Sequence, residues 1–181
     1  MKQGCPKAAF CAARAGMPCM DFFLGLAYTF IVERIEKMAY TVKRFDELTL
    51  KELYGILKIR NAIFIVEQNC PYQDIDGKDE DSVHVFLWRD GQVDACLRFF
   101  PKDEETVQIG RVVTRVHGQG LGGGLLREGI RQVRQMMPSC KRIYIEAQCQ
   151  AQGYYEKVGF KVASDMFLED GIPHVQMILA L

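Results

Sequence analysis

The chain has 181 residues, which is enough for one domain with a hydrophobic core and too few for two. Its 23 Lys and Arg residues equal its 23 Asp and Glu residues, so no net charge attracts it to nucleic acid or to an anionic membrane. Seven irregularly spaced cysteines argue against a disulfide framework and indicate a reducing, cytoplasmic compartment. We expect a compact enzyme without metal, nucleic-acid or membrane partners, as a monomer or homodimer.

Residues 1–37 differ in character from the rest of the chain. Their apolar run, residues 22–32, is shorter than the roughly 20 residues that a helix needs to span a bilayer. Asp21 lies at the edge of this run, and no small-residue cleavage site follows it, which argues against a signal peptide. We expect residues 1–37 to be an extension outside the fold, disordered or loosely attached, and residues 38–181 to form the domain.

The domain begins with a strand-like alternation at residues 40–45 and a helix that follows it. Thr49 and Glu52 form a capping box at the start of this helix. Four residues share one helical face and are expected to pack into the core: Leu50, Leu53, Tyr54 and Leu57. The acidic segment 74–81 lacks the glycine position and the distal glutamate of a calcium loop, so we expect a solvated connection there.

The later elements follow from alternation, helical spacing and turn residues. The pair Asp90 and Gly91 is typical of a hairpin turn. The expected order is three strands, a helix, a strand, a short helix and two strands, at residues 83–88, 92–100, 106–113, 125–137, 142–148, 150–158, 161–168 and 173–179.

The stretch 109–137 joins a strand-like run, IGRVV, to a glycine-dense turn, HGQGLGGG, and then to an amphipathic helical pattern. Glycines allow backbone amides to approach a ligand closely, because no β-carbon blocks the approach. The first turn of the helix would point free amide hydrogens and the positive end of its dipole at a bound phosphate. A glycine-rich loop without a ligand is the alternative interpretation.

Two phosphate-binding families fit this turn. Gly118, Gly120 and Gly123 spell the GxGxxG pattern of dinucleotide-binding domains, and Glu146 lies where a ribose-binding acid would. Only 58 residues follow Gly123, however, which is too few for the rest of a doubly wound sheet. The segment HGQGLG, from His117, resembles instead the RxxGxG/A signature of GNAT acetyltransferases, with histidine in place of the usual arginine or glutamine.

A second segment makes the resemblance specific. YYEKVGF, from Tyr154 to Phe160, resembles the FYxxxGF signature of GNAT enzymes, and further blocks such as EDGIPH at 169–174 look like the ElaA-type subfamily. The resemblance covers residues 42–181. It implies an α/β (α+β) GNAT fold, with a mixed, mostly antiparallel central sheet of six to seven strands, about four flanking helices, and a splay between strands 4 and 5.

The resemblance also implies a reaction, in which acetyl-CoA gives its acetyl group directly to a primary amine of a small molecule or protein. In this family the tyrosine at the position of Tyr155 often protonates the leaving thiolate, and backbone amides hold the pyrophosphate. The residues expected to contact the coenzyme are Val112, Val113, His117, Gly118, Gln119, Gly120, Leu121 and Gly122. A module that senses acetyl-CoA without turnover is the alternative, and the presence of Tyr155 favours the enzyme.

Polar residues in otherwise apolar segments are candidates for the acceptor pocket. These are Arg60, Glu67, Gln68 and His174. For any single one of them, a buried polar group whose hydrogen bonds are satisfied is the favoured interpretation. The pattern alone does not separate the two interpretations.

Overall fold

The computed structural model describes residues 39–118 and 120–181. The expected extension, residues 1–37, and Gln119 of the expected coenzyme turn lie outside the described residues. Within them, no helix is long and apolar enough to cross a membrane.

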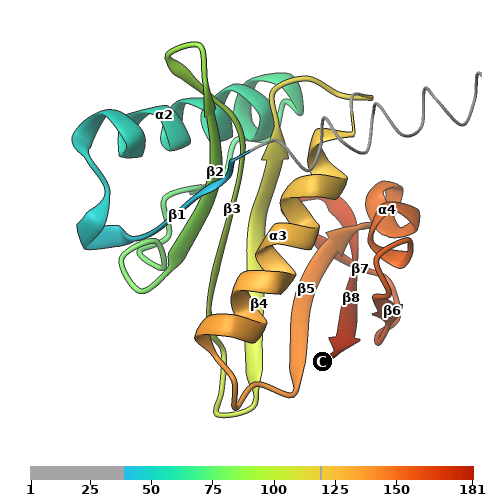
Figure 1. Cartoon of the computed structure of the whole chain (residues 1–181). Helices are drawn as coiled ribbons and strands as arrows, with labels where there is room; N and C mark the ends of the chain where they lie inside the picture. Colours follow the sequence, from blue (N-terminus) through green and yellow to red (C-terminus); the bar gives the residue numbers. More distant parts are fainter. Residues whose placement is uncertain (1–38, 119) are drawn as a thin grey trace, which may run out of the picture. The chain divides into compact units, whose positions relative to one another are not determined.

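The described residues contain one mixed sheet, in the strand order β1-β2-β3-β4-β5-β8-β6, with β7 paired to β8 (Figure 1). The strands are β1 (Thr41–Arg44), β2 (Val83–Arg89), β3 (Gln92–Pro101), β4 (Thr106–Thr114), β5 (Arg142–Gln148), β6 (Lys161–Val162), β7 (Phe167–Glu169) and β8 (Ile172–Ala180). The pair β4 and β5 is parallel, whereas the other pairs in the described residues are antiparallel. The mostly antiparallel sheet implied by the resemblance is confirmed, and the doubly wound parallel sheet of a dinucleotide-binding domain is wrong.

The helices are α2 (Leu50–Arg60), which continues into a π-helical segment at Asn61–Glu67, α3 (Leu121–Met136) and the short α4 (Gln152–Glu156). The Thr49 hydroxyl accepts from the amide of Glu52, and the Glu52 carboxylate accepts from the amide of Thr49, so the predicted capping box is confirmed. The expected strand 161–168 is instead two short strands. The hydroxyl of Ser164 accepts from the backbone amide of Gln176, which breaks the ladder between them.

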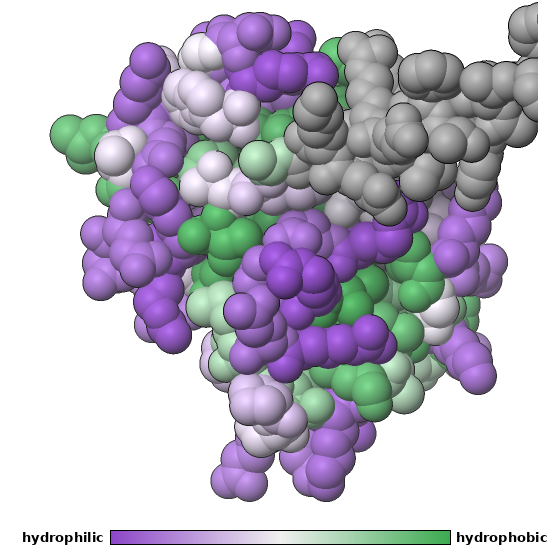
Figure 2. Space-filling model, in the orientation of Figure 1, coloured by the Kyte–Doolittle hydropathy of each residue, from purple (hydrophilic) through white to green (hydrophobic). Residues whose placement is uncertain are grey.

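Helix α3 covers one face of the sheet (Figure 1). Its buried side chains, which include Leu125, Leu126 and Val133, pack against alternate residues of β2, β3, β4 and β5 in the larger hydrophobic cluster. Hydrophilic side chains cover the outer side of α3, and hydrophobic ones are visible beside it (Figure 2). Gly129 allows close packing, because a β-carbon there would lie 2.8 Å from Cδ2 of Leu97.

Helix α2 packs on the opposite face of the sheet, and its buried side differs from the predicted one. Leu50 and Tyr54 are 87% and 72% exposed, so the expected core face is wrong. The buried side carries Ile56 and Ile59, which pack with residues of β2, β3 and β4. Gly55 selects this side, because a β-carbon there would lie only 2.9 Å from a methyl group of Val93.

The acidic segment before β2 is only partly the solvated connection expected from the sequence. Arg60 lies 2.9 Å from Asp74 and 2.7 Å from Asp79, and both Arg60 and Asp79 are buried. Arg98 of β3 pairs with Asp76 at 2.6 Å and with Asp79 at 2.8 Å. These ion pairs fix the segment against α2 and the sheet, since a buried guanidinium is stable only with such partners.

Candidate active site

Strands β4 and β5 are paired along only part of their length. The parallel pairing runs from Thr106 with Arg142 to Gln108 with Tyr144, although β4 continues to Thr114 and β5 to Gln148. Beyond Gln108 the two strands diverge, as Figure 1 shows. The splay implied by the resemblance is therefore present, and it leaves the backbone of β4 without a partner on that side.

A bulge in β4 lies within this opening. Leu97 of β3 faces two residues of β4, Arg111 and Val112, because the register shifts by one residue there. Arg111 has φ +53°, a left-handed conformation that is strained for a side chain other than glycine. Its guanidinium is held by Asp74 and Asp76, at 2.8 and 3.3 Å. The acidic segment thus stabilises an unusual backbone conformation at the opening.

The glycine turn follows β4 and leads into α3. Gly118 and Gly120 have φ values of +77° and +74°, and Gly120 is the N-cap of α3 without a side-chain cap. A β-carbon at Gly118 would meet no described atom within 4 Å, so its surroundings are open. The first turn of α3 contains no acidic residue. Free amides and an uncompensated positive helix end therefore face the turn, which fits the pyrophosphate of a nucleotide coenzyme.

Helix α4 places two adjacent tyrosines differently. Tyr155 lines a cavity, and its ring is held by edge-to-face contacts with Tyr154 and Phe160, at centroid distances of 5.0 and 5.9 Å. Tyr154 lies beside Gly122 in the first turn of α3, with a hydroxyl that is buried without a partner among the described residues. Burial raises the pKa of Tyr155 to about 12, so its hydroxyl stays protonated at neutral pH.

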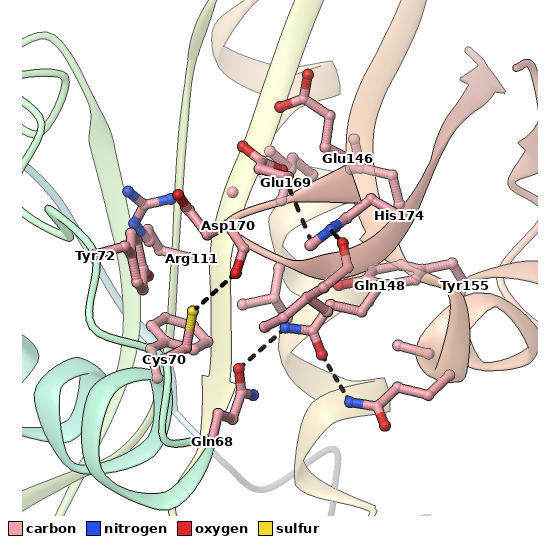
Figure 3. A pocket seen from close by; sticks show the side chains of 18 of the residues that line it. Gln68, Cys70, Tyr72, Arg111, Glu146, Gln148, Tyr155, Glu169, Asp170 and His174 are labelled. Carbon is pink, nitrogen blue, oxygen red and sulfur yellow. Dashed lines mark hydrogen bonds and ion pairs between the residues drawn. The ribbon is translucent and has the colours of Figure 1, made fainter. Parts of the chain in front are cut away.

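The cavity has a volume of about 390 Å³ and lies where β4 and β5 diverge (Figure 3). It is lined by residues of the segment after α2, of β4 and the turn that follows it, of β5, of the 3-10 turn before α4, of α4, and of β7, β8 and the turn between them. These are Phe64, Gln68, Cys70, Tyr72, Gln108, Ile109, Gly110, Arg111, Val112, His117, Ile145, Glu146, Gln148, Gln150, Ala151, Tyr155, Glu169, Asp170, Ile172 and His174.

The cavity brings together residues expected at both predicted sites. Tyr155, Val112 and His117 line it from the coenzyme side. Gln68 and His174 line it from the acceptor side, where the side-chain amide of Gln148 donates to Oε1 of Gln68 at 3.0 Å. Val112 and His174 come from strands on opposite sides of the opening.

Other candidate residues lie elsewhere. Arg60 is buried in its ion pairs with aspartates and is absent from the cavity lining. Glu67 is also absent from the lining, but its carboxylate lies 3.0 Å from Nε2 of His117. Val113 and Leu121 are buried in the two hydrophobic clusters, so only their backbone atoms remain available to a ligand.

The sequence suggested Glu146 only as a ribose-binding acid, and the polar face of β5 was not predicted as a wall of the site. Residues 143, 145 and 147 are buried toward α3, whereas Glu146 and Gln148 point into the cavity. The carboxylate of Glu146 accepts hydrogen bonds from the hydroxyl of Tyr144 at 2.7 Å and from the side-chain amide of Gln108 at 3.3 Å. The alternation of apolar and polar residues in RIYIEAQ contains this signal, because one face of a strand that carries polar groups lines a solvated site.

Comparison with known proteins agrees with this geometry. The family described as an acetyltransferase (GNAT) domain matches residues 52–181. The protein ElaA of Escherichia coli is 38% identical over 138 residues, which are 73% of this chain and 90% of that protein. A UPF0039 protein of Schizosaccharomyces pombe is 38% identical over 150 residues, 81% of this chain and 100% of that protein.

Solved structures give the same result. An acyl-CoA N-acyltransferase from Pseudomonas aeruginosa superposes with a TM-score of 0.72 at 40% identity, over 77% of this chain and 98% of that one. The crystal structure of E. coli ElaA has a TM-score of 0.72 at 34% identity, over 77% and 97% of the two chains. The chain therefore belongs to the GNAT acetyltransferase family, and within it to the ElaA-type subfamily.

Proposed function

We propose that this protein transfers the acetyl group of acetyl-CoA directly to a primary amine of a small-molecule or protein acceptor. The observation that carries the proposal is the divergence of β4 and β5 beside the N-terminus of α3, with Tyr155 lining the cavity between them. One opening thus offers a coenzyme site and an acceptor site next to each other. The name of the similar Pseudomonas protein, an acyl-CoA N-acyltransferase, supports the same reaction class.

The coenzyme would bind along the unpaired side of β4. Its pyrophosphate would accept hydrogen bonds from the amides between Gly118 and Gly122, where the positive end of α3 favours negative charge. Its pantetheine arm would pair with β4 beyond Gln108 as an added strand. A backbone amide near the bulge at Arg111 would then polarise the thioester carbonyl.

The departing thiolate needs a proton, and Tyr155 is placed to donate it. The hydroxyl lies on the cavity, and the raised pKa of Tyr155, about 12, keeps its proton in place until sulfur takes it. Cys149 follows β5 and has no histidine hydrogen-bonded to it among the described residues, so a covalent acyl-enzyme gains no support.

The test is release of free thiol from acetyl-CoA with a panel of amines, namely ethanolamine, cadaverine, tryptamine and a lysine-containing peptide. Amine-dependent thiol release, with the acetylated amine identified by mass spectrometry, is the expected result. Binding of acetyl-CoA without thiol release for any amine would instead support a sensing module.

A further inference from the structure

His174 is a buried histidine on the acceptor side of the cavity. It lies on β8 opposite Gln148 of β5, and it is 9% exposed. Its ring stacks on Phe167 at a centroid distance of 6.1 Å and an interplanar angle of 29°. A ring held in this way has one orientation, so each of its nitrogens has a fixed environment.

The two ring nitrogens of His174 have different partners. Nδ1 lies 2.8 Å from the carbonyl oxygen of Ile172, and because a carbonyl only accepts, Nδ1 must carry the hydrogen. In the neutral ring Nε2 therefore has a free lone pair. The nearest charged atom to it is Oε2 of Glu169 at 3.8 Å, which is too far for a hydrogen bond.

Glu169 is placed to stabilise the ring once it is protonated. A proton on Nε2 would point toward the side of the ring where the carboxylate lies, and opposite charges at this separation attract. The other charged or titratable residues that line the cavity are Cys70 and Tyr72 of the segment after α2, Arg111 of β4, His117 of the glycine turn, Glu146 of β5, Tyr155 of α4, Glu169 of β7 and Asp170 of the following turn. The charge of Arg111 is offset by its ion pairs with Asp74 and Asp76.

We propose that His174 is the general base of this protein, an inference that rests on the proposed acetyl transfer. Nε2 of His174 takes a proton from the acceptor ammonium group and passes it to water. The lone pair of the acceptor nitrogen is then free to attack the thioester carbon. The carbon–nitrogen bond forms, and the carbon–sulfur bond breaks with its electron pair on sulfur, which takes the proton of Tyr155. After the bond has formed, the acceptor nitrogen loses a second proton, which reaches the oxygen of Tyr155 through water. The net products are the amide, coenzyme A and one proton.

The other candidate bases are less suitable. Glu146 already accepts two hydrogen bonds, from the side-chain amide of Gln108 and from the hydroxyl of Tyr144, so both of its carboxylate oxygens are engaged. His117 is largely exposed, and its Nε2 lies against Glu67 rather than free in the cavity. Tyr155 is protonated and serves as an acid.

The test compares His174→Asn with the parent, using whichever amine of the panel gives the fastest thiol release. Asparagine keeps a donor near the position of Nδ1 for the Ile172 carbonyl and removes the base. We expect kcat/KM to fall by about 10²-fold or more, with acetyl-CoA affinity by calorimetry within about twofold of the parent.

A second variant, Glu169→Gln, separates catalysis from structure. Loss of the carboxylate removes the negative charge that would stabilise the imidazolium, so kcat/KM should fall in this variant while acetyl-CoA affinity stays near that of the parent. An unchanged rate in His174→Asn would overturn the role of His174 while leaving acetyl transfer intact. Absence of thiol release by the parent with every amine would overturn both proposals.

Discussion

Nε of Arg111 lies 2.8 Å from Oδ1 of Asp74, and this ion pair joins the bulge of β4 to the acidic segment before β2. The bulge is therefore stabilised from outside the strand. Since φ of Arg111 is +53°, the backbone there is strained, and the ion pair with Asp74 offsets the energetic cost of that strain.

The first prediction separates the ion pair from the backbone strain. Arg111→Ala loses the ion pair and keeps the strain, whereas Arg111→Gly loses the ion pair and relieves the strain, because glycine adopts positive φ readily. We expect the glycine variant to be about 1 kcal/mol more stable than the alanine variant in urea unfolding. Equal stability would mean that the left-handed conformation at this position is not required.

The second prediction concerns acid sensitivity. Burial alone would raise the pKa of Asp76, but hydrogen bonds from Arg98 and the charges of Arg98 and Arg111 outweigh it and lower the pKa to about 2. A lowered pKa in the folded state stabilises the protein above about pH 4, and this contribution is lost as the pH falls toward 2. Asp76→Asn should lower the free energy of unfolding at pH 7 by about 1–3 kcal/mol, because buried Arg98 loses a charged partner.

Urea unfolding of the parent and Asp76→Asn at several pH values checks this prediction. The difference between the two proteins should shrink between pH 4 and pH 2. A constant difference across that range would show that the charge of Asp76 contributes nothing to it.

The third prediction tests which side of α2 is buried. Ile56→Ala should lower the free energy of unfolding by about 2–5 kcal/mol, since this side chain is fully buried against β2 and β3. Leu50→Ala is the matched control and should change stability by less than about 0.5 kcal/mol, because Leu50 is exposed. Comparable losses of stability in the two variants would show that the face inferred from the sequence, which includes Leu50, is also buried.

Local patterns in the sequence were sufficient for much of this fold. The capping box, the hairpin turn at Asp90 and Gly91, and strand β5 follow from near neighbours in the chain, and the structure places them within one or two residues of the predicted positions. The buried face of α2 could not be predicted in the same way, because the helix carries apolar residues on two faces and either could pack against the sheet. Contact at Gly55 with a strand almost 40 residues later decides between them.

The candidate site could likewise be predicted only where it depends on local sequence. The sequence order of the glycine turn and the tyrosine pair indicated a coenzyme site, and Tyr155 does line the cavity. The ion pairs of Arg60 could not be predicted, because its partners, Asp74 and Asp79, lie 14 and 19 residues later, and nothing in the sequence pairs them with it. Residues that meet only through tertiary structure, such as Gln68 and Gln148, need the structure to be recognised.

The fourth prediction concerns the glycine turn. Gly120→Val should abolish the thermal stabilisation by acetyl-CoA, because a branched side chain would occupy the place of the pyrophosphate and would disfavour φ +74°. For the parent, ligand at one hundred times Kd should add about 2.7 kcal/mol of stability. Gly91→Val is the control, since Gly91 has φ +79° in the hairpin between β2 and β3. It should be destabilised while keeping the response to acetyl-CoA, and a lost response in both variants would contradict a local site.

The fifth prediction distinguishes the two tyrosines of α4. Tyr155→Phe keeps the ring that packs against Phe160 and removes only the hydroxyl on the cavity, so stability and acetyl-CoA affinity should change little. Without the proton donor, kcat should fall by about 10²-fold or more. Tyr154→Phe removes a hydroxyl that has no partner among the described residues, so its kcat should stay within twofold or threefold of the parent. Thiol release by the two variants, assayed with the same amine, gives the answer: a damaged Tyr154→Phe beside an active Tyr155→Phe would assign the acid to the other tyrosine.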